Sequence, residues 1–595
     1  MKLEWTSVLS DRAFLDIQLS HWRNAFPLFP TKTQSSDTSG VGPGRLDTAT
    51  NQLSGANNAY QDQLRNKPQI TGSLAYFVDN LGPGNHNFKL GFEWQRDRKQ
   101  FLSFQPGNAF YRDRSGALAE VDIWNTPNES INDATSTAAY LNDTWAINSR
   151  LSVNLGLRMD RYVLGWPEQT IKPELGSVFA NSTDAALRAF LSERTVAAND
   201  PVTFNSFSPR VGFAWDLTGR GKTVFKAFAG KYYYNPSADV TDRENAVGRA
   251  QRRYRFVSCT AGQTSGCDVN NNRLLDGPNE LGTFVTATGG AGSVKIDPGI
   301  DHPYGLEFSA HLEHELIPAV SARASYVFKG TRNEWAEVDT VQVNAYTRDF
   351  AYVDAGPDGA RGTADDQSLT FKDLAALPAT VGSNRVYGNP SDFGLPGFDG
   401  DYHTVEFAIN RRLKDKWMLL ASFEHTWAND FRSPVQASTS SLGTVRQATS
   451  FLWQPNQRQF GREDTTFWNF KILGRYELPW DLAVAGSYKL QSGFQYGRYA
   501  SVALPNAGAQ NIAMEPVNAN RAPNVGILDI RAEKAIKFGG SRKITAMVDV
   551  FNALNSDVVT NFRTISTVSS ATNRYRELIA LLDPRIVRFG VRLDF

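Results

Sequence analysis

The feature of this sequence that most restricts its fold is a repeated alternation of apolar and polar residues. The last nine residues alternate without a break, and one face of that segment holds Val587, Phe589, Val591, Leu593 and Phe595. Successive side chains of a β-strand point to opposite faces, so the pattern predicts a strand between two different environments. Similar segments lie at 151–160, 306–313, 417–423 and 543–550. We therefore expect an all-β protein.

The spacing of these segments narrows the choice of fold. They come in pairs joined by very short turns, at 10–11, 82–84, 148–149, 218–221, 317–318, 414–415, 479–480 and 539–540. Between the pairs lie polar stretches of roughly 20 to 70 residues, far longer than the connections of compact soluble domains. Examples are 22–68, 163–205, 233–301 and 332–400. This arrangement predicts a transmembrane antiparallel β-barrel with short periplasmic turns and long extracellular loops.

Two soluble folds compete with this interpretation. A β-sandwich also alternates, so alternation alone does not decide. A β-propeller would need a repeat of about 40 to 50 residues with a motif in each blade, and the sequence has no such period. The long loops therefore favour the membrane barrel.

Composition agrees with a barrel and excludes one class of partner. No apolar run approaches the roughly 20 residues that a membrane helix needs, and the mean hydropathy is -0.38. A barrel wall has the same average, because only every second residue faces lipid. The 62 Lys and Arg residues balance 61 Asp and Glu residues, so we expect no nucleic-acid partner.

Counting strands gives a further expectation. Eight hairpins supply sixteen strands, and the closing strand 585–595 makes seventeen. Bacterial single-chain barrels have even strand numbers, and plugged outer-membrane transporters have about 22. Residues Met1–Trp5 also lack the basic and then apolar pattern of a secretory signal. We therefore expect residues 1–595 to be the C-terminal barrel domain of a longer protein, without its first strands, about five in number.

Several segments resemble a known family. The resemblance rests on 140–145 with 151–160, 207–216, 222–233, 549–555 and the terminal Phe595. Together these segments look like barrel strands of TonB-dependent receptors, and they are most similar to the Oar-like branch. Members of that branch carry a carboxypeptidase-regulatory-like domain before the plug. The signal peptide, TonB box, plug and first strands of the family have no counterpart in this sequence.

The resemblance implies a function and partners. It implies a receptor in the cell outer membrane that imports a bulky nutrient, powered through TonB by the inner-membrane proton-motive force. TonB would contact the missing N-terminal part, whereas the barrel would meet lipid and the unknown nutrient. Phe595 and its alternating strand resemble the signal of the barrel assembly machinery; the alternative is an ordinary closing strand. Alternative functions are a surface adhesion or secretion-linked barrel and a passive porin.

The long loop at 233–301 contains both cysteines. Cys259 and Cys267 are eight residues apart, and an exported chain passes through an oxidising compartment. We expect them to form a disulfide. Two free thiols are the alternative.

The residues after Cys267 suggest a calcium loop. Oxygen-bearing side chains stand at positions 1, 3, 5 and 9 of a calcium-type loop, namely Asp268, Asn270, Asn272 and Asp276. The pattern departs from the EF-hand at position 6, which is Arg273 instead of Gly, and at position 12, where the nearest carboxylate is Glu280. A solvated polar loop is the alternative. A second acidic stretch, at 354–366, has no specific ligand spacing and is either a calcium loop or a hydrated one.

The sequence gives little support for catalytic or further ligand-binding sites. We find no nucleophile elbow, HExxH or P-loop motif, so we expect no enzymatic activity. Loop aromatics such as Tyr232, Tyr233, Phe451 and Trp453 fit either membrane-interface anchors or a stacking surface for sugars or peptides.

Overall fold

The computed structural model describes residues 1–30, 42–56, 59–289, 294–431, 454–458, 460–539, 542–566 and 575–595. Phe451, Trp453 and Gly540, named in the sequence analysis, lie outside these ranges. No helix within the described ranges is both long and apolar enough to cross a membrane.

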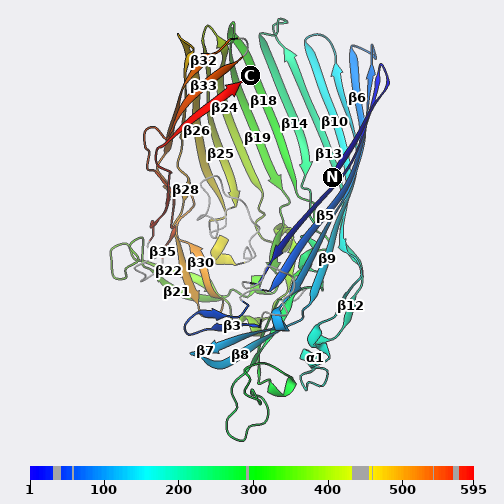
Figure 1. Cartoon of the computed structure of the whole chain (residues 1–595), viewed down its shortest axis with the longest axis vertical. Helices are drawn as coiled ribbons and strands as arrows, with labels where there is room; N and C mark the ends of the chain where they lie inside the picture. Colours follow the sequence, from blue (N-terminus) through cyan, green and yellow to red (C-terminus); the bar gives the residue numbers. More distant parts are fainter. Residues whose placement is uncertain are drawn as a thin grey trace.

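Among the described residues, seventeen antiparallel strands form one sheet, which we call the wall. Figure 1 shows the wall as a curved sheet with its short hairpins at the top and smaller sheets gathered below. Its strands are β1 (Lys2–Ser10), β2 (Ala13–Leu28), β5 (Tyr60–Val78), β6 (Asn85–Phe104), β9 (Asn128–Ala146), β10 (Leu151–Trp166), β13 (Asn199–Asp216), β14 (Thr223–Tyr233), β18 (Tyr304–Ile317), β19 (Val320–Arg332), β24 (Gly400–Lys414), β25 (Trp417–Phe431), β26 (Arg462–Leu478), β27 (Leu482–Gln491), β32 (Val525–Lys537), β33 (Lys543–Phe551) and β37 (Ile586–Asp594). The predicted count of seventeen is confirmed.

All eight predicted hairpins correspond to pairs of neighbouring wall strands, and two of the turns show how local contacts keep them tight. In the β9–β10 turn, the side-chain oxygen of Asn148 accepts from the backbone N–H groups of Arg150 and Leu151. In the β5–β6 turn, Gly84 has φ of +100°, and a Cβ there would lie 2.0 Å from the carbonyl oxygen of Ala146. Residue types such as Asn and Gly, which favour this turn geometry, are the local sequence signal that predicts a hairpin.

The strands run further than the apolar alternation predicts. The predicted loop 22–68 was too wide, because β2 continues to Leu28 and β5 begins at Tyr60. Polar residues there pair across strands, such as Arg23 with Asn66. Above an apolar band both faces of a strand can meet water, so strand pairing continues without the alternation.

The two faces of the wall differ sharply. One cross-strand row consists of Leu15, Leu74, Leu90, Leu141 and Leu157. Leu90 and Leu141 are 56% and 48% exposed, so this face is apolar and uncovered. We call it the outward face. The opposite, inward face carries the polar row Gln18, Thr71, Glu93, Ala138, Asp160 and Ser206.

The buried apolar cores lie among the elements of the long loops and the loop-side ends of wall strands such as β9, β10 and β13. One core joins the six-stranded outer sheet to helix α1 (Ala185–Leu191) and includes Tyr111, Ile123, Leu187 and Phe256. That sheet is made of β3 (Gly44–Asp47), β4 (Gln52–Ser54), β7 (Ala109–Arg114), β8 (Ala117–Trp124), β15 (Ala250–Arg255) and β16 (Phe284–Gly289). Packing of this kind gives the long loops a fixed shape.

The remaining elements are short. The other outer strands are β11 (Gln169–Ile171), β12 (Arg194–Val196), β17 (Val294–Ile296), β20 (Ala336–Asp339), β21 (Arg348–Asp354), β22 (Gln367–Asp373), β23 (Arg385–Gly388), β28 (Gln495–Tyr496), β29 (Tyr499–Leu504), β30 (Gly508–Ala513), β31 (Asn520–Arg521), β34 (Val559–Phe562), β35 (Ile565–Ser566) and β36 (Leu578–Leu581). The helical turns are η1 (Pro106–Asn108), η2 (Glu174–Gly176), η3 (Thr241–Arg243), η4 (Pro278–Glu280), η5 (Gln342–Asn344), α2 (Pro378–Val381), η6 (Pro390–Phe393) and η8 (Pro455–Arg458).

The wall has two edges. In the part of the chain that the structure describes, β1 pairs only with β2 and β37 pairs only with β33. The N–H and C=O groups on the far sides of these two strands therefore lack a ladder partner among the described residues.

Candidate functional site: the inward face and the loops fastened to it

The inward face of β2 to β10 carries a continuous polar chain. Ser20 donates to Gln69, and Gln69 donates to Glu93 over 3.1 Å. Arg158 completes the chain by binding Glu93 at 3.1 Å and Asp160 at 2.9 Å. The residue between Glu93 and Asp160 in the cross-strand row is Ala138, whose small side chain lets the arginine reach across β9. Four strands thus share one connected polar surface.

The other half of the inward face is also lined by charges. The ion pairs there are Lys226–Glu313, Arg323–Glu406, Arg475–Glu533, Arg531–Asp549 and Arg588–Asp549. A hollow of about 690 Å³ lies against β18 to β27, and Lys471 and Lys489 are among the side chains that line it. The inward face can therefore meet water or a polar solute, whereas the outward face cannot do so favourably.

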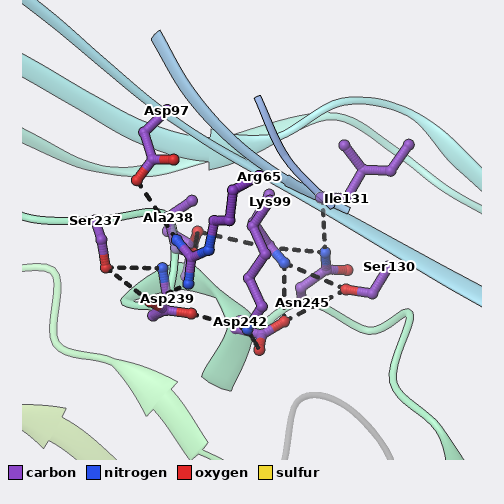
Figure 2. Close-up of polar contacts among 12 residues, drawn as sticks. Arg65, Asp97, Lys99, Ser130, Ile131, Ser237, Ala238, Asp239, Asp242 and Asn245 are labelled. Atoms are coloured by element: carbon purple, nitrogen blue, oxygen red, sulfur yellow. Dashed lines mark hydrogen bonds and ion pairs between the residues drawn. The ribbon is translucent and has the colours of Figure 1, made fainter. Parts of the chain in front are cut away.

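The loop that follows β14 is fastened onto the inward face. Figure 2 shows Arg65 of β5 and Lys99 of β6 pointing toward Asp239 and Asp242 of this loop. Lys99 binds Asp239 at 2.8 Å and Asp242 at 2.6 Å, and Arg65 binds Asp239 at 2.5 Å. Lys99 is only 8% exposed although it carries a full charge, so its position depends on these two carboxylates.

Uncharged groups hold the same loop from β9. Asn132 of β9 donates to Asp242 over 2.9 Å, and Asn245 of the loop donates to Asn132 over 2.9 Å. Both asparagines are almost completely buried. The loop therefore contacts three neighbouring wall strands at the same level, through bonds that leave few polar groups unsatisfied.

These contacts fix the charge of Asp239. Burial alone would raise the pKa of this carboxyl, but the hydrogen bonds from Arg65 and Lys99 outweigh burial and lower the pKa to about 2. Asp239 is therefore ionised at every physiological pH, and the fastening is not a neutral-pH switch.

A second fastening lies around His302, just before β18. Its ring stacks on Phe204 with centroids 4.3 Å apart and meets Tyr162 edge-on at 5.2 Å. Nε2 lies 2.7 Å from the carbonyl oxygen of Tyr234, and Nδ1 lies 2.6 Å from the hydroxyl of Ser206. Burial lowers the pKa of His302 to about 4. The ring is then neutral, donating to Tyr234 and accepting from Ser206.

The two cysteines in the outer loop are joined. Cys259 and Cys267 form a disulfide with Cα atoms 4.9 Å apart, and Cys267 is fully buried. The disulfide closes a short loop that precedes the residues of the predicted calcium loop.

The predicted calcium ligands lie together in one turn. Asp268 accepts from the backbone N–H groups of Asn272 and Arg273, and Asp276 accepts from the amides of Asn270 and Asn272 at 2.7 Å. Glu280, noted from the sequence as the nearest carboxylate, accepts from the backbone N–H of Asp276. No set of three or more His, Cys, Asp or Glu side chains in the described ranges is arranged to hold a metal ion.

The second acidic stretch proves to be occupied by protein contacts. Asp354 is buried and accepts from Arg498 at 2.9 Å. Asp365 accepts from the hydroxyl of Thr363, and Asp366 accepts from the backbone N–H of Gly362. The sequence predicts either a calcium loop or a hydrated loop at 354–366. The structure shows in addition that Asp354 forms a buried ion pair with Arg498.

The predicted assembly strand is β37, at one edge of the wall. Its outward residues are strongly exposed, with Phe589 at 78%, Val591 at 70% and Phe595 at 98%. Val587 and Leu593, which pair with Val550 and Ile544 of β33, are also exposed.

Comparison with known proteins matches this geometry. The family model described as "Outer membrane beta barrel domain" matches residues 1–482. The chain belongs to the outer-membrane β-barrel family. Its location is therefore the cell outer membrane.

A transporter of Myxococcus xanthus is similar to this chain in sequence. The chain is 22% identical over 409 residues to the TonB-dependent transporter Oar of Myxococcus xanthus, a match covering 62% of this chain and 31% of Oar. The chain thus spans less than a third of the length of that relative. This similarity agrees with the resemblance to the Oar-like branch that the strand motifs carry.

Among solved structures, YddB shares the fold. The outer membrane transporter YddB from Escherichia coli superposes with a TM-score of 0.51 at 11% identity, covering 99% of this chain and 67% of YddB. The ferric-catecholate import receptor Fiu from Escherichia coli superposes with a TM-score of 0.48 at 10% identity, covering 99% of this chain and 63% of Fiu.

Proposed function

We propose that this barrel is the wall of a TonB-dependent importer that carries a bulky, polar nutrient across the outer membrane. The observation that carries the proposal is the difference between the two faces of the wall. An exposed row of leucines lies on the outward face, and a connected chain of charged and amide side chains lies on the inward face. The similarity to Oar, which is named a TonB-dependent transporter, supports the mode of energy coupling. The contact with TonB belongs to a part of the protein outside residues 1–595.

We also propose that further strands complete the wall between β1 and β37. Backbone groups in the hydrocarbon region must find partners within the protein, so an open sheet edge does not persist in lipid. The two edges of the wall therefore call for added strands, and about five would give the size of the plugged transporters. A wall of that width needs a movable obstruction, which is the role of a plug in such proteins.

Uptake by living cells tests the transport proposal. The full-length protein is expressed in cells with and without functional TonB, and accumulation of a panel of labelled chelates, vitamins, glycans and peptides is measured. We expect one solute to accumulate only when TonB is functional. Equal uptake in cells with and without functional TonB would instead support a passive porin. Surface binding without accumulation of any solute would support an adhesion or secretion-linked barrel.

For the outer loop, we propose that Asp268, Asn270, Asn272 and Asp276 bind a structural calcium ion. These residues supply two carboxylates and two amide oxygens at calcium-type spacing, and Glu280 adjoins them. Calcium would replace the amide donors that Asp268 and Asp276 accept from, while the disulfide keeps the start of the loop closed.

Protease protection tests the calcium proposal. In the full-length protein we expect calcium to slow cleavage within 259–280, and the double variant Asp268→Ala/Asp276→Ala to lose that protection. The matched control is Asp358→Ala, in the second acidic stretch, which should leave the protection intact. Equal cleavage of the unaltered protein with and without calcium would exclude the site.

We further propose that β37 with Phe595 is the strand that the barrel assembly machinery recognises. The strand lies at an edge of the wall, and its apolar residues alternate up to the chain end, where they are accessible to a partner strand.

A further inference from the structure

The outward face of the wall changes from apolar to cationic at a level eight to thirteen residues from the turn-side ends of several strands. Between the short turns and this level, most outward positions are apolar, as in Leu151, Leu155 and Met159 on β10. At this level stand the outward side chains of Arg23 on β2, Arg96 and Arg98 on β6, Arg161 on β10, Lys231 on β14 and Arg332 on β19. We call these six residues the cationic belt.

The level coincides with the expected edge of the hydrocarbon layer. Arg23 and Arg161 each lie ten residues from the turn-side end of their strands, which begin at Ala13 and Leu151. At about 3.3 Å per residue this is roughly 33 Å along the strand. Strands tilted by about 40° then rise about 25 Å, which is the height of the apolar band of a membrane barrel. The six residues lie between eight (Lys231) and thirteen (Arg98) residues from the turn-side ends of their strands, so by the same estimate they stand about 20 to 33 Å from the short turns. The belt therefore lies around the edge of the apolar band, where lipid headgroups meet a barrel wall.

Aromatic rings rather than carboxylates hold part of the belt in place. The ammonium group of Lys231 lies 3.8 Å from the ring centroid of Tyr304 and 4.6 Å from that of Tyr233. Arg161 donates to the amide oxygen of Asn205 over 3.2 Å. Within the described ranges neither cation has an ion-pair partner. Their charge is oriented along the outward face and is not neutralised by the protein.

The carboxylates that do meet the belt are too few to neutralise it. Arg96 and Arg98 both donate hydrogen bonds to the carboxylate of Asp133 on β9, over 2.7 to 3.0 Å. Arg332 binds Asp401 of β24, which also binds Arg462. Two shared carboxylates thus face six cations of the belt, and the net charge of this surface is positive.

The belt occupies only one side of the wall. On β25 the outward residue ten positions from the turn-side end is Trp427, and on β27 the residue eight positions from it is Leu490. An outward cation does occur on that side, Arg462 of β26, but it binds Asp401. Cations that have no carboxylate partner and lie beside aromatic rings at a membrane interface are suited to anionic headgroups.

We propose that the cationic belt binds phosphate groups of anionic lipids in the outer leaflet around this side of the wall. Arg96 and Arg161 lie two strands apart, with β9 between them, which is about 10 Å. Two phosphates of one headgroup could therefore be bound together. Guanidinium groups bind phosphate through paired N–H donors, and Lys231 adds a point charge held over two rings.

Lipid discs containing the full-length protein test the proposal. One set of discs contains a diphosphorylated glycolipid, and the other contains the same glycolipid without its phosphates; the lipid retained by the protein is measured by native mass spectrometry. The test variant is Arg161→Gln/Lys231→Gln. The matched control is Lys226→Gln/Lys329→Gln, which removes two cations from the inward face of β14 and β19.

We expect the unaltered protein and the control to prefer the phosphorylated lipid, and the test variant to bind it about tenfold more weakly. Binding of the lipid without phosphates should be the same for all three proteins. The proposal fails if the test variant retains the phosphate preference, if the unaltered protein has none, or if the control loses as much as the test variant. None of these outcomes depends on solute uptake.

Discussion

At the scale of single residues, the inward surface depends on charged groups far apart in the sequence. Lys99 meets Asp239 and Asp242, about 140 residues away, at a position where it is almost buried. In one sequence these residues look like solvated loop and strand residues, and no local pattern distinguishes them. The Cys259–Cys267 pair could be anticipated because a separation of eight residues is itself local information.

The Lys99 fastening gives a first prediction. Lys99→Met leaves Asp239 and Asp242 facing one another with only Arg65 and amide donors, so we expect the loop 234–249 to open more often. Because both carboxylates are partly exposed, the cost is about 1 to 2 kcal/mol, or roughly tenfold faster hydrogen exchange around η3. Lys329→Met, which removes an exposed cation from the inward face of β19, should leave this exchange unchanged.

His302 predicts a pH dependence of the neighbouring loop. Burial lowers its pKa to about 4, against about 6.5 in an unfolded chain. A group whose pKa is lower in the folded state stabilises the fold above about pH 6.5, and that contribution is lost as the pH falls toward 4. We expect protease cleavage within 234–249 to rise between about pH 6.5 and pH 4 in the unaltered protein. His302→Gln, which cannot titrate, should show a flat profile; parallel profiles would contradict the assignment.

At the scale of elements, hairpins and wall strands could be predicted because their signals are local. Period-two alternation marks Leu151 to Met159 as a strand, and residues such as Asn148 mark its turn. The strand ends could not be predicted, since Gln61, Asp62 and Gln63 carry no apolar alternation and yet pair fully with β6. The outer strands were missed for a related reason. They are short, and apolar cores formed from distant loops stabilise them.

The β5–β6 turn offers a matched pair of glycine substitutions. Both Gly82 and Gly84 have positive φ, but a Cβ at Gly82 meets nothing within 4 Å, whereas at Gly84 it meets the backbone of Ala146. We expect Gly82→Ala to cost about 1 kcal/mol of unfolding free energy and Gly84→Ala clearly more, about 2 to 4 kcal/mol. Denaturant unfolding in detergent measures both. Equal costs would show that the turn relaxes around the new methyl group.

Strand β37 gives a prediction about assembly. If the machinery recognises this strand, deletion of Phe595 should lower the fraction of folded protein in the outer membrane several-fold, seen as a loss of the heat-modifiable band on gels. Phe538→Ala is the control, because Phe538 is also exposed, at 60%, near a short turn but not at the chain end. Undiminished insertion without Phe595 would leave β37 as an ordinary edge strand.

At the scale of the whole molecule, the two edges of the wall determine how the protein must be completed. If further strands lie between β1 and β37, then Trp5→Cys with Phe589→Cys should not crosslink in the full-length protein. Trp5→Cys with Ile17→Cys should crosslink, because these residues are direct partners of β1 and β2. A β1–β37 crosslink in the full-length protein would mean that the wall closes with seventeen strands.

The order of strands in the wall also has an evolutionary consequence. Every wall strand pairs only with its neighbours in the chain, and each long loop leaves and re-enters the wall between two adjacent strands. An insertion or exchange in one outer loop therefore alters no register elsewhere in the wall. Selection can therefore change the outer surface, whose loops also pack on one another, while the strand order of the wall is inherited intact. New ligand specificities, or escape from agents that attack the exposed loops, can thus arise without a new fold.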